Sequence, residues 1–334
     1  MANLLEDIIK ERIRKNGPMG VGAFMSLALG HPEHGYYINR DPLGRGGDFI
    51  TAPEVSQLFG EMIGVWVADV WMQMGRPEQF ILLECGPGRG TLMADMLRAT
   101  RSVAGFYDAA QICLLEVSPV LREVQCGALE GHEVQWFDRL EAVSNDTPMI
   151  VVGNEFLDAL PFQQFVGDCE RVVALDGDDL VFIPEGGDIF ERSAERERFA
   201  ADVCGRLKVQ GGAALFIDYG HIRSGMGDTF QAVKGHEYVD VFSHIGDADL
   251  TSHVDFEALG RAIEAKVFGP VTQGAFLKAM GAGLRLEALR QKAGEQQAAI
   301  LEKGLHRLVD SAQMGELFKV IGFTHDKNII PAGF

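Results

Sequence analysis

Short apolar runs alternate with helical patterns from about residue 80 onward. The runs that read as strands occupy residues 81–85, 112–117, 134–137, 149–153 and 213–218, with a closing run at 317–323. Between the first three of these runs, apolar residues recur at helical spacing over 92–101 and 120–129. This alternation predicts an α/β fold with a doubly wound, mainly parallel sheet and right-handed crossovers.

The residues before this sheet form a separate pattern. Apolar positions predict a helix over 4–13, a second over 19–29, and a buried helix from Pro53 to Gly75. The stretch between them is rich in Gly and Pro and reads as a loop. We therefore expect N-terminal helices and a loop over residues 1–76, followed by the main domain over 77–334. Part of the loop, 44–54, could close as a lid with Asp48 reaching inward, or could be a surface loop.

Two insertions interrupt the main domain. Residues 162–191 predict a meander of three short strands separated by Asp/Gly turns, and residues 222–311 predict a segment rich in loops and helices. The meander is acidic. It could attract a basic peptide, or it could be a solvated strand face.

Composition limits the class of protein. Residues of hydrophobic type make up 47% of the chain, which is typical of an ordinary globular protein. The chain carries 30 Lys and Arg against 48 Asp and Glu, a net charge of −18, which disfavours nucleic acid and anionic membrane surfaces as partners. A neutral or basic partner fits better, and the sequence does not predict an oligomeric state.

Cysteines and the N-terminal residues indicate the compartment. The five cysteines are scattered without a Cys-x-x-Cys pair, so we expect neither a zinc site nor a disulfide framework. His31 and His34 lack further ligands at metal-binding spacing, and we expect no metal. Glu6 and Asp7 do not fit a signal or transit peptide, and no apolar run is long enough to span a bilayer. These features predict a cytoplasmic protein.

A glycine-rich turn follows the first strand of the sheet. Gly86, Gly88 and Gly90 occupy alternate positions, with Thr91 next. No Lys follows Gly90, so the turn is not a phosphate-binding Walker A loop, and the third glycine comes one residue too early for a dinucleotide fingerprint. The turn either clears space for another ligand or is a tight turn without one.

Acidic residues at two strand ends favour a ligand. Glu84, beside the glycines, would repel a pyrophosphate and suit an ammonium group. Glu116, at the end of the next strand, could hold two ribose hydroxyls. A ribose and an amino-acid head group together indicate S-adenosylmethionine. Trp136 and Phe137, followed by Asp138, end the third strand, where adenine could stack and donate its amino group, although a Trp there is as often part of the core.

The fourth strand leads into a loop with three polar residues. Asn154, Glu155 and Asp158 come directly after it, at the edge where the methyl donor would lie. They could orient a substrate, or Asn154 and Asp158 could simply cap a turn. The fifth strand ends in residues 218–221 (DYGH) at the same edge, and His253 with Asp255 could supply a second base or an orienting pair, although a structural histidine is at least as common.

Several segments together resemble one known family. They are GDFITAPEVSQLFG, LLECGPGRGTLMADMLR, EVSP, NEFLDALPFQ, DYGH and GDADLTSHVDF, and they lie between about residue 36 and residue 277. In these segments the chain resembles the MidA-like family of S-adenosylmethionine-dependent methyltransferases. The resemblance implies a seven-strand-type methyltransferase fold, and mitochondrial members of the family methylate an arginine of a respiratory complex I subunit.

Three functions follow as alternatives. The first is a protein arginine methyltransferase, with Asn154 beside the cofactor and with Glu155, Asp158 and His253 acting on the acceptor. The second is an assembly chaperone that keeps the cofactor pocket but only holds a partner subunit. The third, a nicotinamide oxidoreductase, is disfavoured by the glycine spacing.

Overall fold

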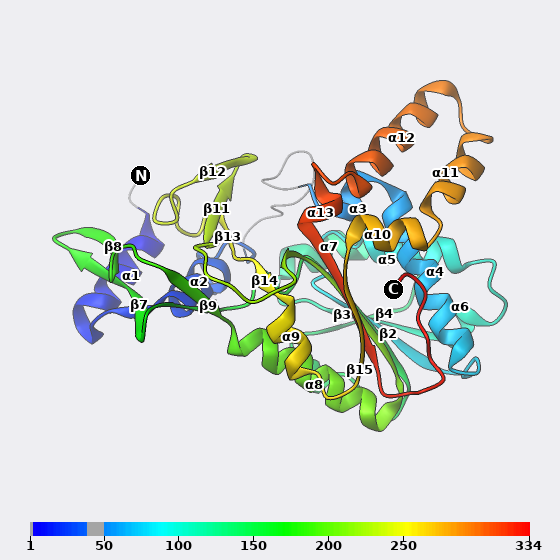
Figure 1. Cartoon of the computed structure of the whole chain (residues 1–334), viewed down its shortest axis with the longest axis horizontal. Coiled ribbons are helices and arrows are strands. Elements are labelled where there is room, and N and C mark those ends of the chain that lie inside the picture. Colours follow the sequence, from blue (N-terminus) through cyan, green and yellow to red (C-terminus); the bar gives the residue numbers. More distant parts are fainter. Residues whose placement is uncertain (1–2, 39–49) are drawn as a thin grey trace.

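The computed structural model describes residues 3–38 and 50–334. At its centre, within the described residues, is a mainly parallel sheet of eight strands (Figure 1). Seven follow the order β15-β16-β10-β5-β2-β3-β4, and β14 pairs with β10. Their bounds are β2 Phe80–Cys85, β3 Ala110–Leu115, β4 Val134–Phe137, β5 Met149–Asn154, β10 Gly212–His221, β14 Val254–Asp255, β15 Lys266–Thr272 and β16 Phe318–Thr324. Only β15–β16 and β16–β10 pair antiparallel, which confirms the predicted fold class.

Both faces of the sheet are buried. Leu82 and Ile150 face one hydrophobic core, while their neighbours Ile81 and Val151 face the other. The first core includes α4 (Gln57–Gln73) and α5 (Thr91–Thr100), and the second includes α8 (Ala194–Gln210) and α9 (Phe256–Ala262). Burial on both faces explains why these strands are continuous apolar runs in the sequence.

The buried helix predicted from Pro53 to Gly75 is broken near its start. Ser56 adopts an extended conformation with φ −162°, and its side chain accepts a hydrogen bond of 3.3 Å from the Leu58 amide. The chain therefore forms a short helix α3 (Ala52–Val55) and then α4, with Ser56 as the N-cap of α4. The remaining helices beside this sheet are α6 Phe106–Ala109, α7 Pro119–Ala128, η1 Leu140–Ala142, α10 Gln273–Ala279, α11 Ala282–Arg290, α12 Glu295–Val309 and α13 Met314–Leu317.

The N-terminal helices pack against the inserted strands. α1 (Leu4–Asn16) and α2 (Val21–Gly30) share a third hydrophobic core with them, and Figure 1 shows this group at the end of the molecule opposite the C-terminus. The strands of the first insertion, with the N-terminal β1, are β1 Met19–Gly20, β6 Gln163–Val166, β7 Cys169–Asp176, β8 Asp179–Ile183 and β9 Ile189–Arg192. The predicted meander is thus confirmed, with β9 as an additional strand.

The prediction for residues 222–311 was wrong in part. Besides loops and helices, this segment contains a three-stranded sheet, β14 and the edge strand β15. The strands of the small sheet are β11 Gln231–Lys234, β12 Glu237–Val239 and β13 Asp249–Thr251. They are only three or four residues long, which is too short for a periodic pattern to stand out.

Residues 1–76 divide between two cores. α1 and α2 belong to the third hydrophobic core, whereas α4 packs against α5 beside the main sheet. The predicted domain boundaries stay a prediction, and the proposed lid residue Asp48 lies outside the described residues. Among the helices of residues 3–38 and 50–334, none combines the length and the apolar character needed to cross a membrane.

Candidate active site

A cavity of about 520 Å³ lies at the carboxyl ends of β2, β3 and β5. β3 and β5 flank β2 on opposite sides, so the cavity is at the point where the strand order reverses and where α/β sheets bind ligands. Most of the predicted site residues line it: Glu84, Gly86, Gly88, Thr91, Glu116, Asp138, Asn154 and Glu155. Residues of α2 and Tyr37 from the N-terminal segment also line it.

The glycine turn needs glycines for its backbone conformation. Gly86, Gly88 and Gly90 have φ values of +64°, +52° and +83°, in the left-handed region that other residues rarely adopt. A Cβ on Gly86 would also lie 2.9 Å from the ring of Phe156. Gly90 is the N-cap of α5 and does not line the cavity, while Thr91 begins that helix and donates a hydrogen bond to Glu54 of α3.

Glu84 is a buried acid with unused bonding capacity. Its side chain is 2% exposed, and burial raises its pKa to about 8. No described residue donates a hydrogen bond to its Oε2. A buried oxygen without a donor is costly, so a ligand that brings donors into the cavity would be stabilised there.

Glu116 lies directly after β3 and is fixed by two donors. Its Oε1 accepts a hydrogen bond of 2.7 Å from the Ser118 amide, and its Oε2 accepts one of 3.1 Å from Gln125. Burial raises the pKa of this carboxyl. The hydrogen bonds hold the carboxylate at the cavity wall, next to where a ligand would lie.

Gln125 of α7 connects three parts of the site. Its Nε2 also donates to the Gly88 carbonyl at 2.7 Å, and its Oε1 accepts a hydrogen bond of 2.8 Å from the indole of Trp136. The side chain is fully buried. Gln125 was not predicted as a site residue, although a polar residue four positions after Leu121 on one helix face was an available signal.

The predicted adenine wall is only partly at the cavity. Trp136 and Phe137 pack against the cores on opposite faces of the sheet and do not line the cavity, because successive strand residues point to opposite faces. Asp138, the next residue, lines the cavity and is paired with Arg122. The wall beyond β4 is formed by residues 138–141.

Glu155 has a strained backbone and a half-buried side chain. Its φ is +50°, which is uncommon outside glycine and costs free energy that the surrounding structure must offset. Its Oε1 accepts hydrogen bonds from the Ala52 amide at 2.9 Å and from Asn154 at 3.1 Å. Burial raises its pKa to about 7. Oδ1 of Asn154, also buried, has no donor among the described residues.

Asp218 of β10 shapes the loop that follows Glu155. Its Oδ2 accepts hydrogen bonds from the amides of residues 156, 157 and 158 at 3.1, 2.9 and 3.2 Å. The capping role considered for Asn154 and Asp158 therefore belongs to Asp218. This carboxylate holds the turn so that Glu155 faces the cavity.

Asp158 lies behind the cavity wall. Its side chain is 5% exposed and does not line the cavity, and burial raises its pKa while the guanidinium of Arg196 lowers it. Asp158 and Asp249 of β13 both lie near Tyr37, whose hydroxyl donates a hydrogen bond of 2.9 Å to Asp249. Carboxylates thus gather near the Glu155 end of the cavity.

His253 does not line the cavity that Glu155 lines, although the sequence suggested that the two residues could act together. β14 begins at Val254, which pairs with Gly220, three residues beyond the β10 residue that pairs with Asn154. His253 therefore lines a second cavity, together with His221 and Asp255. The strand register that separates it from the first cavity is not visible in the sequence.

Comparison with known proteins identifies the family. A family model described as putative S-adenosyl-L-methionine-dependent methyltransferase matches residues 62–183 and 178–271. The chain belongs to this family. It is 33% identical to the mitochondrial protein arginine methyltransferase NDUFAF7 of Xenopus laevis, over 95% of this chain and 84% of the relative. It is 36% identical to the mouse protein of the same name, over 92% and 81% of the two chains.

A solved structure has the same fold. A candidate methyltransferase from Burkholderia thailandensis, solved with S-adenosylhomocysteine bound, superposes with a TM-score of 0.85 at 28% identity. The match covers 98% of this chain and 93% of that one. The chain is thus an S-adenosylmethionine-dependent methyltransferase.

The cavity fits the cofactor of this family. S-adenosylmethionine carries donors at its ammonium, its ribose hydroxyls and its adenine amino group. The polar atoms left without a partner at the cavity, Oε2 of Glu84 and Oδ1 of Asn154, are acceptors. Glycine backbone lines the same wall, so a ligand can approach closely.

Proposed function

We propose that this enzyme methylates an arginine side chain of a protein substrate. The support is the position of Glu155, a half-buried carboxyl with a strained backbone at the cavity, together with the activity named for the relatives. Arginine keeps its proton at any ordinary pH, so the enzyme has to orient and polarise the guanidinium rather than deprotonate it beforehand.

We assign the cofactor to the half of the cavity at the carboxyl ends of β2 and β3. Glu84 and Asn154 would accept from the ammonium group, with Gly86, Gly88, Gly90 and Thr91 forming the turn beside it. Glu116 would hold the ribose hydroxyls, and Asp138 the adenine amino group. For Trp136 we now propose an indirect role through its hydrogen bond to Gln125.

Glu155 would bind the acceptor. Both of its hydrogen bonds go to Oε1, and no described residue donates to Oε2. When bound, S-adenosylmethionine supplies an activated methyl group on a positively charged sulfur. As the nitrogen–carbon bond forms and the sulfur–carbon bond breaks, the guanidinium loses one proton, which Oε2 of Glu155 can accept. Asp158 would add negative charge behind this carboxylate.

The identity of the acceptor protein is a further part of the proposal. We propose a subunit of respiratory complex I or of a similar complex, on the strength of the family resemblance, which also supports a role in complex assembly. The curated relatives are mitochondrial by name, and the cytoplasmic location predicted for this chain stays a prediction.

Two experiments test the class of function. Calorimetric titration should show binding of S-adenosylhomocysteine and not of NADH, because the glycine turn lacks the dinucleotide spacing. Incubation with methyl-labelled S-adenosylmethionine and cell lysate should label a protein. Cofactor binding without any labelled protein would favour the chaperone alternative over the enzyme.

A further inference from the structure

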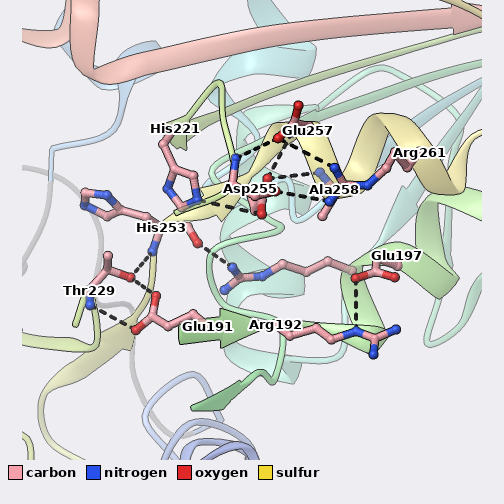
Figure 2. Close-up of polar contacts among 12 residues, drawn as sticks. Glu191, Arg192, Glu197, His221, Thr229, His253, Asp255, Glu257, Ala258 and Arg261 are labelled. Carbon is pink, nitrogen blue, oxygen red and sulfur yellow. Dashed lines mark hydrogen bonds and ion pairs between the residues drawn. The ribbon is translucent and has the colours of Figure 1, made fainter. Parts of the chain in front are cut away.

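A second cavity of about 380 Å³ lies beyond the end of β10, between β9, α8, β14 and α9. Figure 2 shows its side chains, with Glu191 and Arg192 of β9 on one side and His221, Asp255 and Arg261 on the other. Arg196 of α8 also lines it. Neither the cofactor nor the acceptor assignment uses this cavity.

The acceptor atoms around this cavity are largely occupied. Glu191 accepts hydrogen bonds from the amide and hydroxyl of Thr229 and from Gln164. Oδ1 of Asp255 accepts from the amides of residues 257 and 258 and caps α9. Glu197 is paired with Arg192, at 3.6 Å from Oε1 to Nε.

Donors, in contrast, remain available. Arg196 is 5% exposed, and its Nε has no acceptor among the described residues. Among the described residues, Arg192 has one contact for its five N–H donors, the 3.6 Å pair with Glu197. Nε2 of His221 is 3.9 Å from Asp255, beyond hydrogen-bonding distance. Arg261 donates a hydrogen bond to Ser224 and pairs with Glu257. Among the described residues, some of its guanidinium N–H donors remain unused.

The surroundings add positive potential. α8 has 17 residues, and its N-cap, Ser193, lines the cavity, so the positive end of the helix dipole points there. The whole chain carries −18, which repels anions at long range. At physiological salt, however, charges more than about 8 Å away are strongly screened, so the charge of the whole chain acts weakly here, and the nearby acids Glu191, Glu197 and Asp255 are engaged by the contacts described above.

We propose that this cavity is a binding site for an oxyanion, a carboxylate or a phosphate. The ligand must supply acceptors, because the unused polar groups are mainly donors, although Oδ2 of Asp255 also has no donor among the described residues. Arg192, Arg196 and Arg261 would bind it, with His221 at the side. Arg196 also donates to the carbonyls of Asp158 and Leu160, so the bound anion would adjoin the loop that carries Glu155. The anion could be free or could be an acidic side chain of the substrate protein.

The test measures anion binding to the full-length protein by calorimetry, with inorganic phosphate and N-acetylglutamate as separate probes. The variant is Arg192→Gln combined with Arg261→Gln, and the control is Arg198→Gln. Arg198 is a matched control because its side chain is 60% exposed, against 59% for Arg192, but it pairs with Glu195 and does not line the cavity.

We expect saturable binding of at least one probe, weakened at least about tenfold in the double variant and unchanged in Arg198→Gln. Tighter binding of phosphate indicates a free anion as the ligand, and tighter binding of N-acetylglutamate an acidic side chain. No saturable binding, equal binding by the double variant, or an equal loss in the control would overturn the proposal. Because no methyl transfer is measured, failure here is distinguishable from failure of the proposed function.

Discussion

The backbone amide of Ala52 donates a hydrogen bond of 2.9 Å to Oε1 of Glu155. This bond ties the start of α3 to the loop after β5, although about one hundred residues separate them in the chain. The neighbouring Glu54 of α3 accepts a hydrogen bond from Thr91 at the start of α5. The segment before the sheet therefore fixes both ends of the cavity, the proposed acceptor end and the cofactor end.

Replacement of Glu155 by Gln keeps the shape of the side chain and an oxygen for the Ala52 amide, but removes the charge. We expect methyl transfer to fall about 100-fold or more, the scale for a positioned polar catalytic group, with little change in affinity for S-adenosylhomocysteine. Transfer assays and calorimetry on the same preparation separate the two effects. Glu123→Gln, an exposed change on α7, is the control. Joint loss of binding and activity would instead make Glu155 a structural or cofactor-binding residue.

The pH dependence of the reaction should reflect the ionisation of the Glu155 carboxyl. Burial raises its pKa to about 7 in the free protein, so it is mostly protonated below that pH and charged above it. A charged carboxylate is needed to bind the guanidinium, so kcat/KM should rise as pH increases through about 7. In Glu155→Gln this inflection should disappear. An inflection that persists in the variant would have to come from another group.

Glu116→Ala tests the assignment of the ribose. Loss of hydrogen bonds to a charged group should weaken binding of S-adenosylhomocysteine by about 1.5–3 kcal/mol, measured by calorimetry. Glu141→Ala provides a comparison, since Glu141 lines the same cavity but is exposed. An unaltered dissociation constant for Glu116→Ala would mean that other residues hold the ribose.

Gln125→Leu tests the buried connection between the glycine turn, Glu116 and Trp136. The change removes the partner of the half-buried Gly88 carbonyl and Trp136 indole and of the buried Oε2 of Glu116, and a buried unsatisfied group costs about 1–3 kcal/mol. We expect a lower midpoint of thermal unfolding and weaker cofactor binding. Gln135→Leu, a change at an exposed residue of β4, should change neither. Full stability of Gln125→Leu would show that the network is dispensable.

The central strands could be predicted because they are buried on both faces. Residues 80–83 and 149–153 carry no polar side chain, and the polar residues at the carboxyl ends of these strands fall at one edge of the sheet. This is why Glu84, Glu116 and Glu155 were selected correctly as lining residues of one cavity.

The edge strand β15 could not be predicted in this way, because it is not a continuous apolar run. Its sequence, KVFGPVT, contains Gly269 and Pro270, the register shifts between Phe268 and Val271, and much of the strand is only half-buried. Proline and irregular pairing are tolerated at a sheet edge but resemble a loop in the sequence.

Parts of the site depend on tertiary packing that a single sequence does not reveal. Gln125 is polar on the buried face of a helix, and only its three partners explain its position. His253 reaches the second cavity because β14 pairs with the last residues of β10. Trp136 does not line the cavity, because its indole packs against the first core and donates a hydrogen bond to Gln125.

The most direct test of the account is the chemical identity of the methylated residue. The purified protein is incubated with methyl-labelled S-adenosylmethionine and lysate of the source cell, and the labelled peptides are sequenced by mass spectrometry. We predict label on the guanidinium nitrogen of an arginine, and strongly reduced label with Glu155→Gln despite normal cofactor binding. Label on lysine, on a small molecule or on another group, or equal label with the variant, would contradict it.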